Sequence, residues 1–382
     1  MVQRVGILGA GHTTFAERRD DVRLEELVFE AAASALADAG IARADLGTVV
    51  MAGADQLDGR SISSMMAAGP AGAYLKDEIR TTTEGSYAAI LAGLRILSGE
   101  YETALAITWS KTSESPYDLI SSLSYDPFFS RPVAFNDVVE SAIVSSTYPS
   151  PTVQLAEAAA AIVVKNRRNG SANPRAFLRE PTTAEAVLAS PYVAYPIRSA
   201  ELPPPCDGAV ALVLASEERV LRSERPPVWI QGFGWGTSNY GYRGGEAAAG
   251  LAGLRAAAAN AYAMAGVSRP ASEIEFAEVF DGTPFDELLA YEALGLASQG
   301  KGAEFALEGG SAAGGSCPVN LSGGAQSTNL RFAAGMMRIL EAYLQLSHRA
   351  GPVQLVAPRQ GLAHGATSYP AQGHAVFVLR NY

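Results

Sequence analysis

Short apolar runs alternate along the chain with longer segments in which apolar residues recur every three to four positions. Residues 5–9 and 48–53 are short apolar runs that end in glycine, which is typical of buried strands. Residues 24–40 and 85–97 show helical spacing, and a glycine closes or soon follows each of them. A further apolar run covers residues 103–108. The first part of the chain is therefore predicted to alternate strands and helices.

The second part of the chain repeats this order. Apolar strand patterns cover residues 228–234, 276–280 and 353–358, and a helical pattern covers residues 332–346. A similar order of elements in both parts of a chain indicates an internal duplication.

A short motif supports the duplication. Ala263-Met264-Ala265-Gly266 repeats Ala37-Asp38-Ala39-Gly40, and each closes a predicted helix. We place the two halves at residues 1–225 and 226–382, and residues 110–152, which are rich in Ser, Pro and Tyr, form an inserted loop region. Because parallel strands need helical crossovers, we predict an α/β fold with two mostly parallel sheets.

Composition narrows the function. The 382 residues are 48% hydrophobic and 18% charged, as in ordinary globular proteins, and the net charge of −10 argues against nucleic acid or an anionic membrane as a partner. No apolar run reaches the roughly 18 residues of a membrane span, and the N-terminus leads directly into a strand pattern, so we expect a cytoplasmic protein. The two cysteines lack the spacing of a metal site, and no metal is expected.

The most informative stretch covers residues 317–335 and reads Cys-Pro-Val-Asn-Leu-Ser-Gly-Gly-Ala-Gln-Ser-Thr-Asn-Leu-Arg-Phe-Ala-Ala-Gly. Asn320 precedes the turn Ser322-Gly323-Gly324, where the backbone can approach another group closely, and a helix of small residues follows. This combination is typical of an active site.

The stretch resembles the Asn-Pro-Ser-Gly-Gly signature of the thiolase superfamily. The Ala-rich segment 157–166, Ala189-Ser190-Pro191 and the turn Pro204-Pro205-Cys206-Asp207-Gly208-Ala209 also resemble its sterol-carrier/lipid-transfer branch. The resemblance covers nearly the whole chain. It implies a duplicated five-layer αβαβα fold, a CoA thioester as substrate and no permanently bound cofactor.

The resemblance also implies partners. Thiolase-like proteins form homodimers or heterodimers with a thiolase-like paralogue, and members of this branch can work with a small OB-fold partner that carries a zinc ribbon. We place the dimer contact on the predicted strand at residues 103–108, whose apolar edge would otherwise be exposed.

The thiolase nucleophile is a cysteine at the start of the small-residue helix, and the resemblance places Thr82 at that position. Thr82 is either a nucleophile that needs a base from elsewhere or, as we favour, a helix cap. Glu84 is either a buried general base or a carboxylate favoured by the helix dipole.

Other family positions have also changed. Phe280 replaces a polar residue, and Leu330 replaces a histidine that holds the thioester carbonyl. Asp281 is kept and either titrates in the pocket or caps the helix that starts near Pro284. His364 matches a histidine on the last loop of the lipid-transfer branch and is the best remaining candidate to hold a carbonyl or move a proton.

Two functions are consistent with these residues. The first is a lipid-transfer-type thiolase homologue that makes or breaks a C–C bond by retro-aldol chemistry on a 3-hydroxyacyl-CoA with a lipid or steroid side chain. His364, Asp281, Glu84 and Asn320 would share the chemistry, because this reaction needs a base and an oxyanion pocket but no cysteine. The second is a catalytically silent subunit or scaffold in a complex with an active paralogue or the OB-fold partner.

Overall fold

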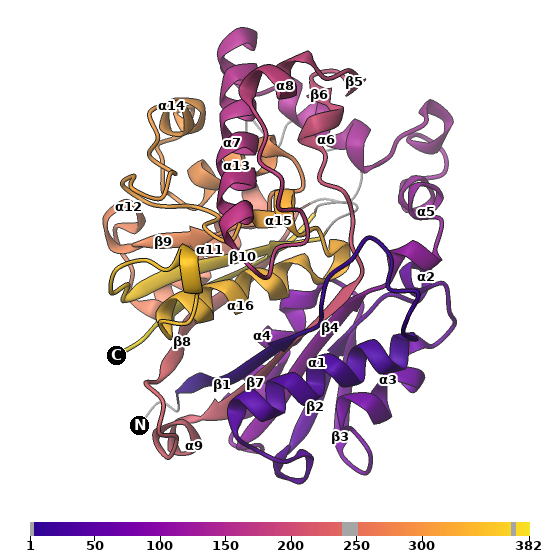
Figure 1. The fold of residues 1–382 in the computed structure, drawn as a ribbon, viewed down its shortest axis with the longest axis vertical. Coiled ribbons are helices and arrows are strands. Elements are labelled where there is room, and N and C mark those ends of the chain that lie inside the picture. Colours follow the sequence, from indigo (N-terminus) through magenta and orange to yellow (C-terminus); the bar gives the residue numbers. More distant parts are fainter. Residues whose placement is uncertain (1–3, 239–250, 368–371) are drawn as a thin grey trace.

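The computed structural model describes residues 4–238, 251–367 and 372–382 (Figure 1). The strands are β1 (Val5–His12), β2 (Thr48–Ala52), β3 (Asp77–Thr81), β4 (Thr103–Ser110), β5 (Tyr192–Ala194), β6 (Ile197–Arg198), β7 (Gly208–Ser216), β8 (Val228–Thr237), β9 (Phe276–Glu278), β10 (Gln360–Ala366) and β11 (Gly373–Arg380). The helices are α1 (Leu24–Ala39), α2 (Asp55–Asp58), α3 (Ser63–Ala71), α4 (Gly85–Leu97), α5 (Tyr117–Leu123), α6 (Asp137–Ser146), α7 (Thr152–Ala172), α8 (Ala184–Ala189), α9 (Glu217–Leu221), α11 (Ala252–Ala265), α12 (Pro270–Glu273), α13 (Pro284–Ala293), α14 (Gly302–Leu307), α15 (Gly324–Ser327) and α16 (Ala334–Leu346).

One large sheet organises the described residues, with strand order β3-β2-β4-β7-β1-β8-β11-β10-β9. The strands before β8 come from the first part of the chain and the others from the second part. The two parts meet where β1 and β8 pair antiparallel over three residue pairs, from Val5 with Ile230 to Ile7 with Val228. β5 and β6 form a separate small hairpin.

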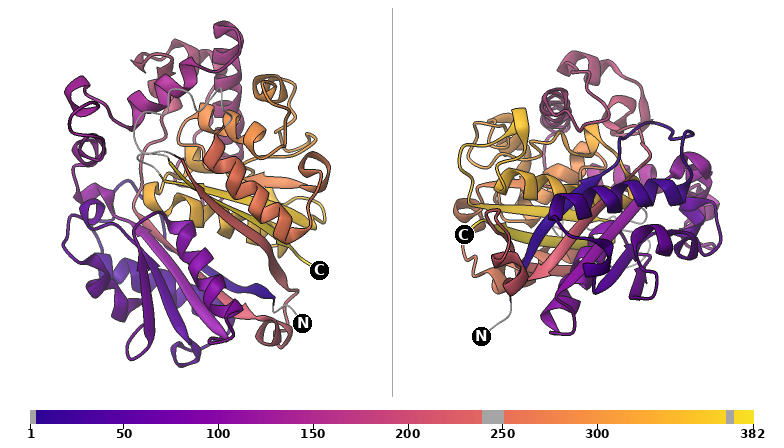
Figure 2. Two further views of the ribbon diagram at one scale, coloured as in Figure 1. Left: turned by 180° about the vertical axis from the view of Figure 1, so that it is seen from behind. Right: turned by 60° about the horizontal axis from the view of Figure 1, so that its bottom comes forward.

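Helices cover both faces of each part of this sheet (Figures 1 and 2). α4 packs on β2 and β4, α16 packs on β10 and β11, and these two helices contact each other between the two parts. α1 covers β1 and β7 from outside, and α11 covers β8 and β11 in the same way. The predicted α/β class is confirmed, and its helices and sheet parts alternate in five layers.

Small residues allow the outer helices to approach the sheet closely. A Cβ atom on Gly11 of β1 would lie 2.3 Å from the backbone nitrogen of Ala35 in α1. A Cβ atom on Gly234 of β8 would lie 2.2 Å from the backbone oxygen of Ala257 in α11. The glycines of the first strand in each part therefore serve helix packing in the same way.

Strand direction differs from our prediction. We expected mostly parallel sheets, but only β2–β3, β2–β4 and β9–β10 are parallel among the described pairs, and the sheet is mixed. β7 runs antiparallel to both β4 and β1, and β10 and β11 pair as antiparallel neighbours. An apolar run predicts a buried strand but carries no information about its direction.

One predicted strand is absent, and another was wrongly placed at the edge of the sheet. Residues 353–358 form no strand; a 3₁₀ turn at Gly351–Val353 precedes an irregular segment, and the strand begins at Gln360. β4 is not an edge, because β2 and β7 pair with it on either side. The edge of this part of the sheet is β3, which pairs only with β2 among the described strands. The expected dimer contact at residues 103–108 is therefore wrong.

Candidate functional site

Glu84 lies at the N-terminus of α4 and is fully buried. Its Oε2 atom accepts hydrogen bonds from the Ser86 backbone nitrogen at 2.8 Å and from the Ser86 hydroxyl, and its Oε1 atom accepts one from the Gly335 backbone nitrogen at 2.8 Å. Burial raises the pKa of Glu84 to about 7, although these hydrogen bonds favour its ionised form. One carboxylate thus joins the first turns of the two central helices.

The space around Glu84 is closed by two glycines. A Cβ atom on Gly335 of α16 would lie 2.6 Å from Glu84 Oε2, and one on Gly365 of β10 would lie 2.5 Å from the Ser86 hydroxyl. Glu84 therefore packs against backbone on both sides. It holds α4, α16 and β10 together and has little room to meet a substrate directly.

Thr82 does not cap α4, as we had expected. Its side chain is exposed and lies two residues before the N-cap, which is Glu84, whose side chain accepts from the Ser86 backbone. The Glu84 carboxylate itself accepts from the first turn, so a capping hydroxyl from Thr82 is not needed.

His364 is 3% exposed and lies inside strand β10, not on a loop. Its Nε2 atom lies 3.2 Å from the Nδ1 atom of His374 in β11, and the two rings are stacked with centroids 5.4 Å apart. The hairpin register brings Ala366 opposite His374, so the two histidines are diagonal neighbours on one face. Sequence analysis missed His374 because it did not recognise the β10–β11 hairpin.

Burial lowers the pKa of His364 to about 3 because the charged imidazolium is poorly solvated there. His364 is therefore neutral at physiological pH. A neutral imidazole can donate one hydrogen bond and accept another, but a pKa this low makes it a weak base. Its Nδ1 atom has no hydrogen-bond partner among the described residues.

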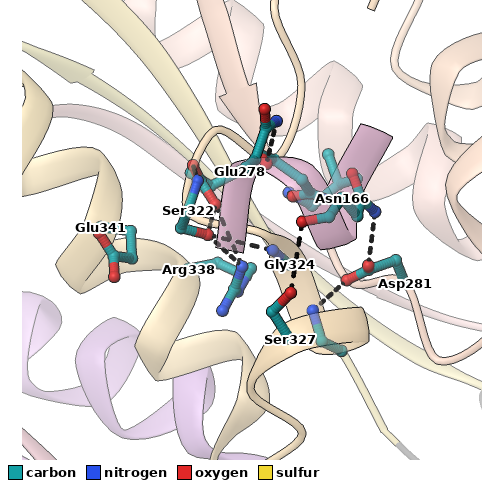
Figure 3. Close-up of polar contacts among 12 residues, drawn as sticks. Asn166, Glu278, Asp281, Ser322, Gly324, Ser327, Arg338 and Glu341 are labelled. Atoms are coloured by element: carbon teal, nitrogen blue, oxygen red, sulfur yellow. Dashed lines mark hydrogen bonds and ion pairs between the residues drawn. The ribbon is translucent and has the colours of Figure 1, made fainter. Parts of the chain in front are cut away.

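The signature turn is held from inside by a network of buried polar groups (Figure 3). Asn320 has a left-handed backbone with φ 53°, and its side chain accepts from the Val279 nitrogen at 2.8 Å and donates to Glu287 at 2.8 Å. Asn169 of α7 donates to the Asn320 carbonyl at 3.0 Å. The Asn320 side chain, predicted to be catalytic, is thus fully engaged in positioning the turn.

Ser322 continues the network. Its hydroxyl donates to Glu278 Oε2 at 2.5 Å and accepts from Arg338 Nη1 at 2.7 Å, and Arg338 also pairs with Glu278 at 3.1 Å (Figure 3). Burial raises the pKa of Glu278 to about 7, and Arg338 opposes this shift. Gly323 and Gly324 follow with φ 98° and 62°, so the turn uses the left-handed backbone that favours glycine.

Asp281 caps a different helix from the one we expected. It accepts from the backbone nitrogens of Ala325 at 2.5 Å and Gln326 at 3.2 Å in the short helix α15, and from the Asn166 side chain at 2.9 Å. Thr283 caps the helix at Pro284 instead. Burial, and then the charge of nearby Glu287, raise the pKa of Asp281 well above its usual value.

A buried ion pair ties α7 to this network. Lys165 Nζ lies 2.7 Å from Glu287 Oε1 in α13 and donates to the Val319 carbonyl at 2.7 Å. Its side chain is 8% exposed and that of Glu287 is fully buried. Sequence analysis missed both residues, because an isolated lysine in an Ala-rich helix gives no indication of its partner.

Phe280 and Leu330 lie at the side of this network. Leu330 is fully buried in the core, and Phe280 lines a small cavity of about 80 Å³ together with Asn329 and Arg331, the neighbours of Leu330. The Phe280 backbone nitrogen donates to the His364 carbonyl at 3.0 Å. The cavity therefore adjoins the segment of β10 that carries His364.

The Arg331 guanidinium lies 3.9 Å above the Tyr117 ring and 3.6 Å from Asp137, so this cavity has a cation at its wall. Arg331 also has a positive φ of 47°. Sequence analysis singled out its neighbour Leu330 but not Arg331 itself.

Both cysteines are buried. Cys206 is 1% exposed and Cys317 is 2% exposed, and burial raises the pKa of Cys206 far above its usual value and that of Cys317 to about 12. Neither lies at the start of α4. Among the residues that the structure describes, no group of three or more His, Cys, Asp or Glu side chains could hold a metal ion. Those residues also form no helix that is long and apolar enough to span a bilayer.

Comparison with known proteins shows which proteins this chain is similar to. The model of the thiolase C-terminal domain-like family matches residues 244–381. The acetyl-CoA acetyltransferase of Methanothermobacter thermautotrophicus is 27% identical over 97% of this chain and 98% of that protein. The 17-hydroxy-3-oxo-4-pregnene-20-carboxyl-CoA lyase of Mycobacterium tuberculosis is 25% identical over 97% of this chain and 98% of its own.

A third relative and a solved structure complete the comparison. Sterol carrier protein 2 of Oryctolagus cuniculus is 30% identical over 52% of this chain and 37% of that protein. The solved structure described as an Ltp2-ChsH2(DUF35) aldolase superimposes with a TM-score of 0.82 at 23% identity, over 99% of this chain and 98% of that chain. The predicted duplicated fold is confirmed by this likeness.

Proposed function

Because the chain belongs to the thiolase superfamily and is similar to its sterol-carrier branch, we propose that it acts on an acyl-CoA thioester by retro-aldol chemistry. The substrate is a 3-hydroxyacyl-CoA with a lipid or steroid side chain, and the reaction cleaves or forms the bond between C2 and C3. Two relatives support this proposal, since one is named a steroid carboxyl-CoA lyase and the other an aldolase.

The observation that carries the proposal is which residues lie at the start of α4. Glu84 occupies the cap, Thr82 is exposed nearby, and both cysteines are buried elsewhere. A Claisen thiolase needs a thiolate to take the acyl group. Retro-aldol cleavage needs only a base and a group that holds the thioester oxygen, so it proceeds without an acyl-enzyme.

The proposed step balances within the substrate. A base removes the proton of the 3-hydroxyl group, the O–H electrons form the new carbonyl, and the C2–C3 bond breaks. Its electrons pass to the thioester as an enolate, which takes up a proton at C2. We assign the hydrogen bond to the thioester oxygen to His364, because its neutral ring can donate one, whereas a pKa of about 3 makes it too weak a base for the 3-hydroxyl proton.

The other predicted site residues position this chemistry. Glu84 joins the two central helices and packs against Gly365, the neighbour of His364 in β10, and Asp281 and Asn320 fix the signature turn. Phe280 and Leu330 supply apolar walls, and the backbone of Ser322, Gly323 and Gly324 forms the turn that approaches the substrate.

The test is an assay of the purified chain on a panel of acyl-CoA and 3-hydroxyacyl-CoA esters, with the released carbonyl compound and the shortened acyl-CoA both measured. We expect both products in equal amounts and no requirement for free CoA. Turnover that depends on free CoA would indicate thiolysis and contradict the proposal.

The alternative is a catalytically silent subunit, and one observation favours it. The side chains of Asn320 and Ser322 are engaged in internal hydrogen bonds, so the signature is needed for folding alone. In that case the chain has no activity by itself on the panel, and an active paralogue gains activity when this chain is added.

For assembly we propose a dimer through β3. Ile62, Met65, Tyr74 and Leu75 are exposed apolar side chains in the segment that leads to this edge strand, and an open edge of this kind invites pairing. Association with a paralogue or an OB-fold partner is the alternative, in line with the two-component description of the aldolase relative. A stable monomer in light scattering at micromolar concentration, with no partner present, would contradict the dimer.

A further inference from the structure

An open cavity of about 490 Å³ lies between α7, α8 and α14, away from the residues assigned to catalysis. α7 contacts both other helices along this region, at the top of the molecule in Figure 1. Its walls are mainly apolar, and they include Ala161 and Val164 of α7, Leu188 of α8 and Leu307 of α14. This volume lies within the range of small-molecule sites.

Charged residues mark the two ends of the cavity. Glu157 and Arg168 both line it from α7 and are separated by eleven residues, which is about 16 Å along a helix. Arg168 is exposed, and its guanidinium forms no ion pair with another described residue. The cavity is therefore an apolar channel with an unpaired cation at one end and a carboxylate at the other.

We propose that this channel binds a single-chain amphiphile with an anionic carboxylate head. The apolar walls cover the chain, because burial of apolar surface is the main favourable term for such a ligand. Arg168 receives the head group, and Glu157 at the far end disfavours the reversed orientation by charge repulsion.

The channel is connected to the signature turn through one helix. Lys165 lines the channel with its aliphatic part, and its ammonium group holds Glu287 and the Val319 carbonyl at 2.7 Å each. The next residue, Asn166, donates to Asp281. A ligand in the channel packs on the outer face of the helix whose inner face positions the turn.

The binding test uses 11-(dansylamino)undecanoate as a fluorescent probe of the full chain. We expect saturable binding that decanoate displaces. Decyltrimethylammonium, which has a similar chain but a cationic head, should displace the probe at least about tenfold less well. Equal displacement by both compounds would indicate adsorption without head-group recognition and would overturn the proposal, as would absence of saturable binding.

Two variants locate the site. Ala161→Trp fills the middle of the channel and should weaken binding of the probe by more than about tenfold, while Ala156→Trp, on the same helix but outside the lining, should not. Arg168→Gln should weaken binding of decanoate by up to about fivefold, as expected for an exposed ion pair. Unchanged binding in Ala161→Trp, with its melting temperature near that of the wild type, would place the probe elsewhere and overturn the proposal.

Discussion

The Nε2 atom of His364 lies 3.2 Å from the Nδ1 atom of His374, so the two rings share one proton across the β10–β11 hairpin. If His364 donates this proton, its Nδ1 atom is an unprotonated acceptor, and if His364 accepts, its Nδ1 atom carries the proton. In both cases the Nδ1 atom of His364 has no partner among the described residues. His374 thereby decides whether His364 presents an acceptor or a donor.

His364→Ala should lower turnover on a 3-hydroxyacyl-CoA by roughly 10²- to 10³-fold, the usual cost of losing an oxyanion donor. His348→Ala is the control, because His348 is exposed and lies outside the hairpin, just after α16. Steady-state rates of both variants and the wild type make the comparison. Equal rates in His364→Ala and the wild type would remove His364 from the mechanism.

The substitution His374→Gln tests the role of the second ring of the pair. We expect a smaller loss in kcat with little change in KM, because His374 acts through the ring of His364 and contacts no substrate in our proposal. A variant with unchanged kcat would show that His374 does not set the tautomer of His364.

Incubation with acetyl-CoA or a longer acyl-CoA should leave the intact mass of the protein unchanged. The reason is that both thiols are buried and protonated, and no base among the described residues forms a hydrogen bond with the exposed Thr82 side chain. Intact-mass spectrometry followed by peptide mapping makes the measurement. A stable adduct on Thr82, Cys206 or Cys317 would mean that a covalent intermediate forms.

Glu84 should make stability depend on pH. Its folded pKa of about 7 lies above the ordinary 4.5, so the folded protein binds the extra proton between these values. The contribution of this protonation to the free energy of unfolding is fully present below about pH 4.5. It is lost as the pH rises through about 7, which lowers the free energy of unfolding by about 3 kcal/mol. Urea unfolding measured near pH 5 and near pH 8 gives the loss of unfolding free energy between these values. This loss should be smaller in Glu84→Gln than in the wild type.

The exposed Glu100→Gln is the matched control and should keep the full decrease. Glu201 and Glu278 also have raised pKa values of about 7, so part of the pH dependence remains in Glu84→Gln. An identical decrease in the wild type and Glu84→Gln would show that Glu84 is ionised across this range.

Lys165→Met should destabilise the fold by about 3 to 5 kcal/mol, because it leaves the Glu287 carboxylate buried without its cation. The control is Lys301→Met, which removes an exposed pair with Glu304 and should cost less than about 1 kcal/mol. Chemical unfolding of the two variants gives the difference. Equal stabilities would mean that the side chains of Asn166 and Asn320 suffice to compensate Glu287.

The sequence predicted the α/β class, the helix at Gly85–Leu97 to the residue and the importance of the signature turn. Apolar spacing and glycine ends carry this information locally. It did not reveal that Glu84 meets Gly335, a contact between residues 251 positions apart. It also missed β10, which reads Gln-Gly-Leu-Ala-His-Gly-Ala and lacks the continuous apolar run by which other buried strands were found.

The roles of the signature residues could not be predicted for a related reason. The pattern around Asn320 is the same whether its side chain faces a substrate or an internal carboxylate. Only the position of Glu287, supplied by another helix, distinguishes the two. The polar residue types in the sequence therefore predicted where the site lies. The packing of distant helices decided which of these side chains are free to contact a substrate.

The pairing of β1 has a consequence for synthesis of the chain. β1 pairs only with β7 and β8 among the described strands, and β7 begins at Gly208. A nascent chain therefore exposes the first strand without a partner until about two hundred residues more have left the ribosome. Fragments that end in the insertion would lack the strand between β4 and β1, so we expect early translational arrest to yield aggregation-prone products that need a chaperone.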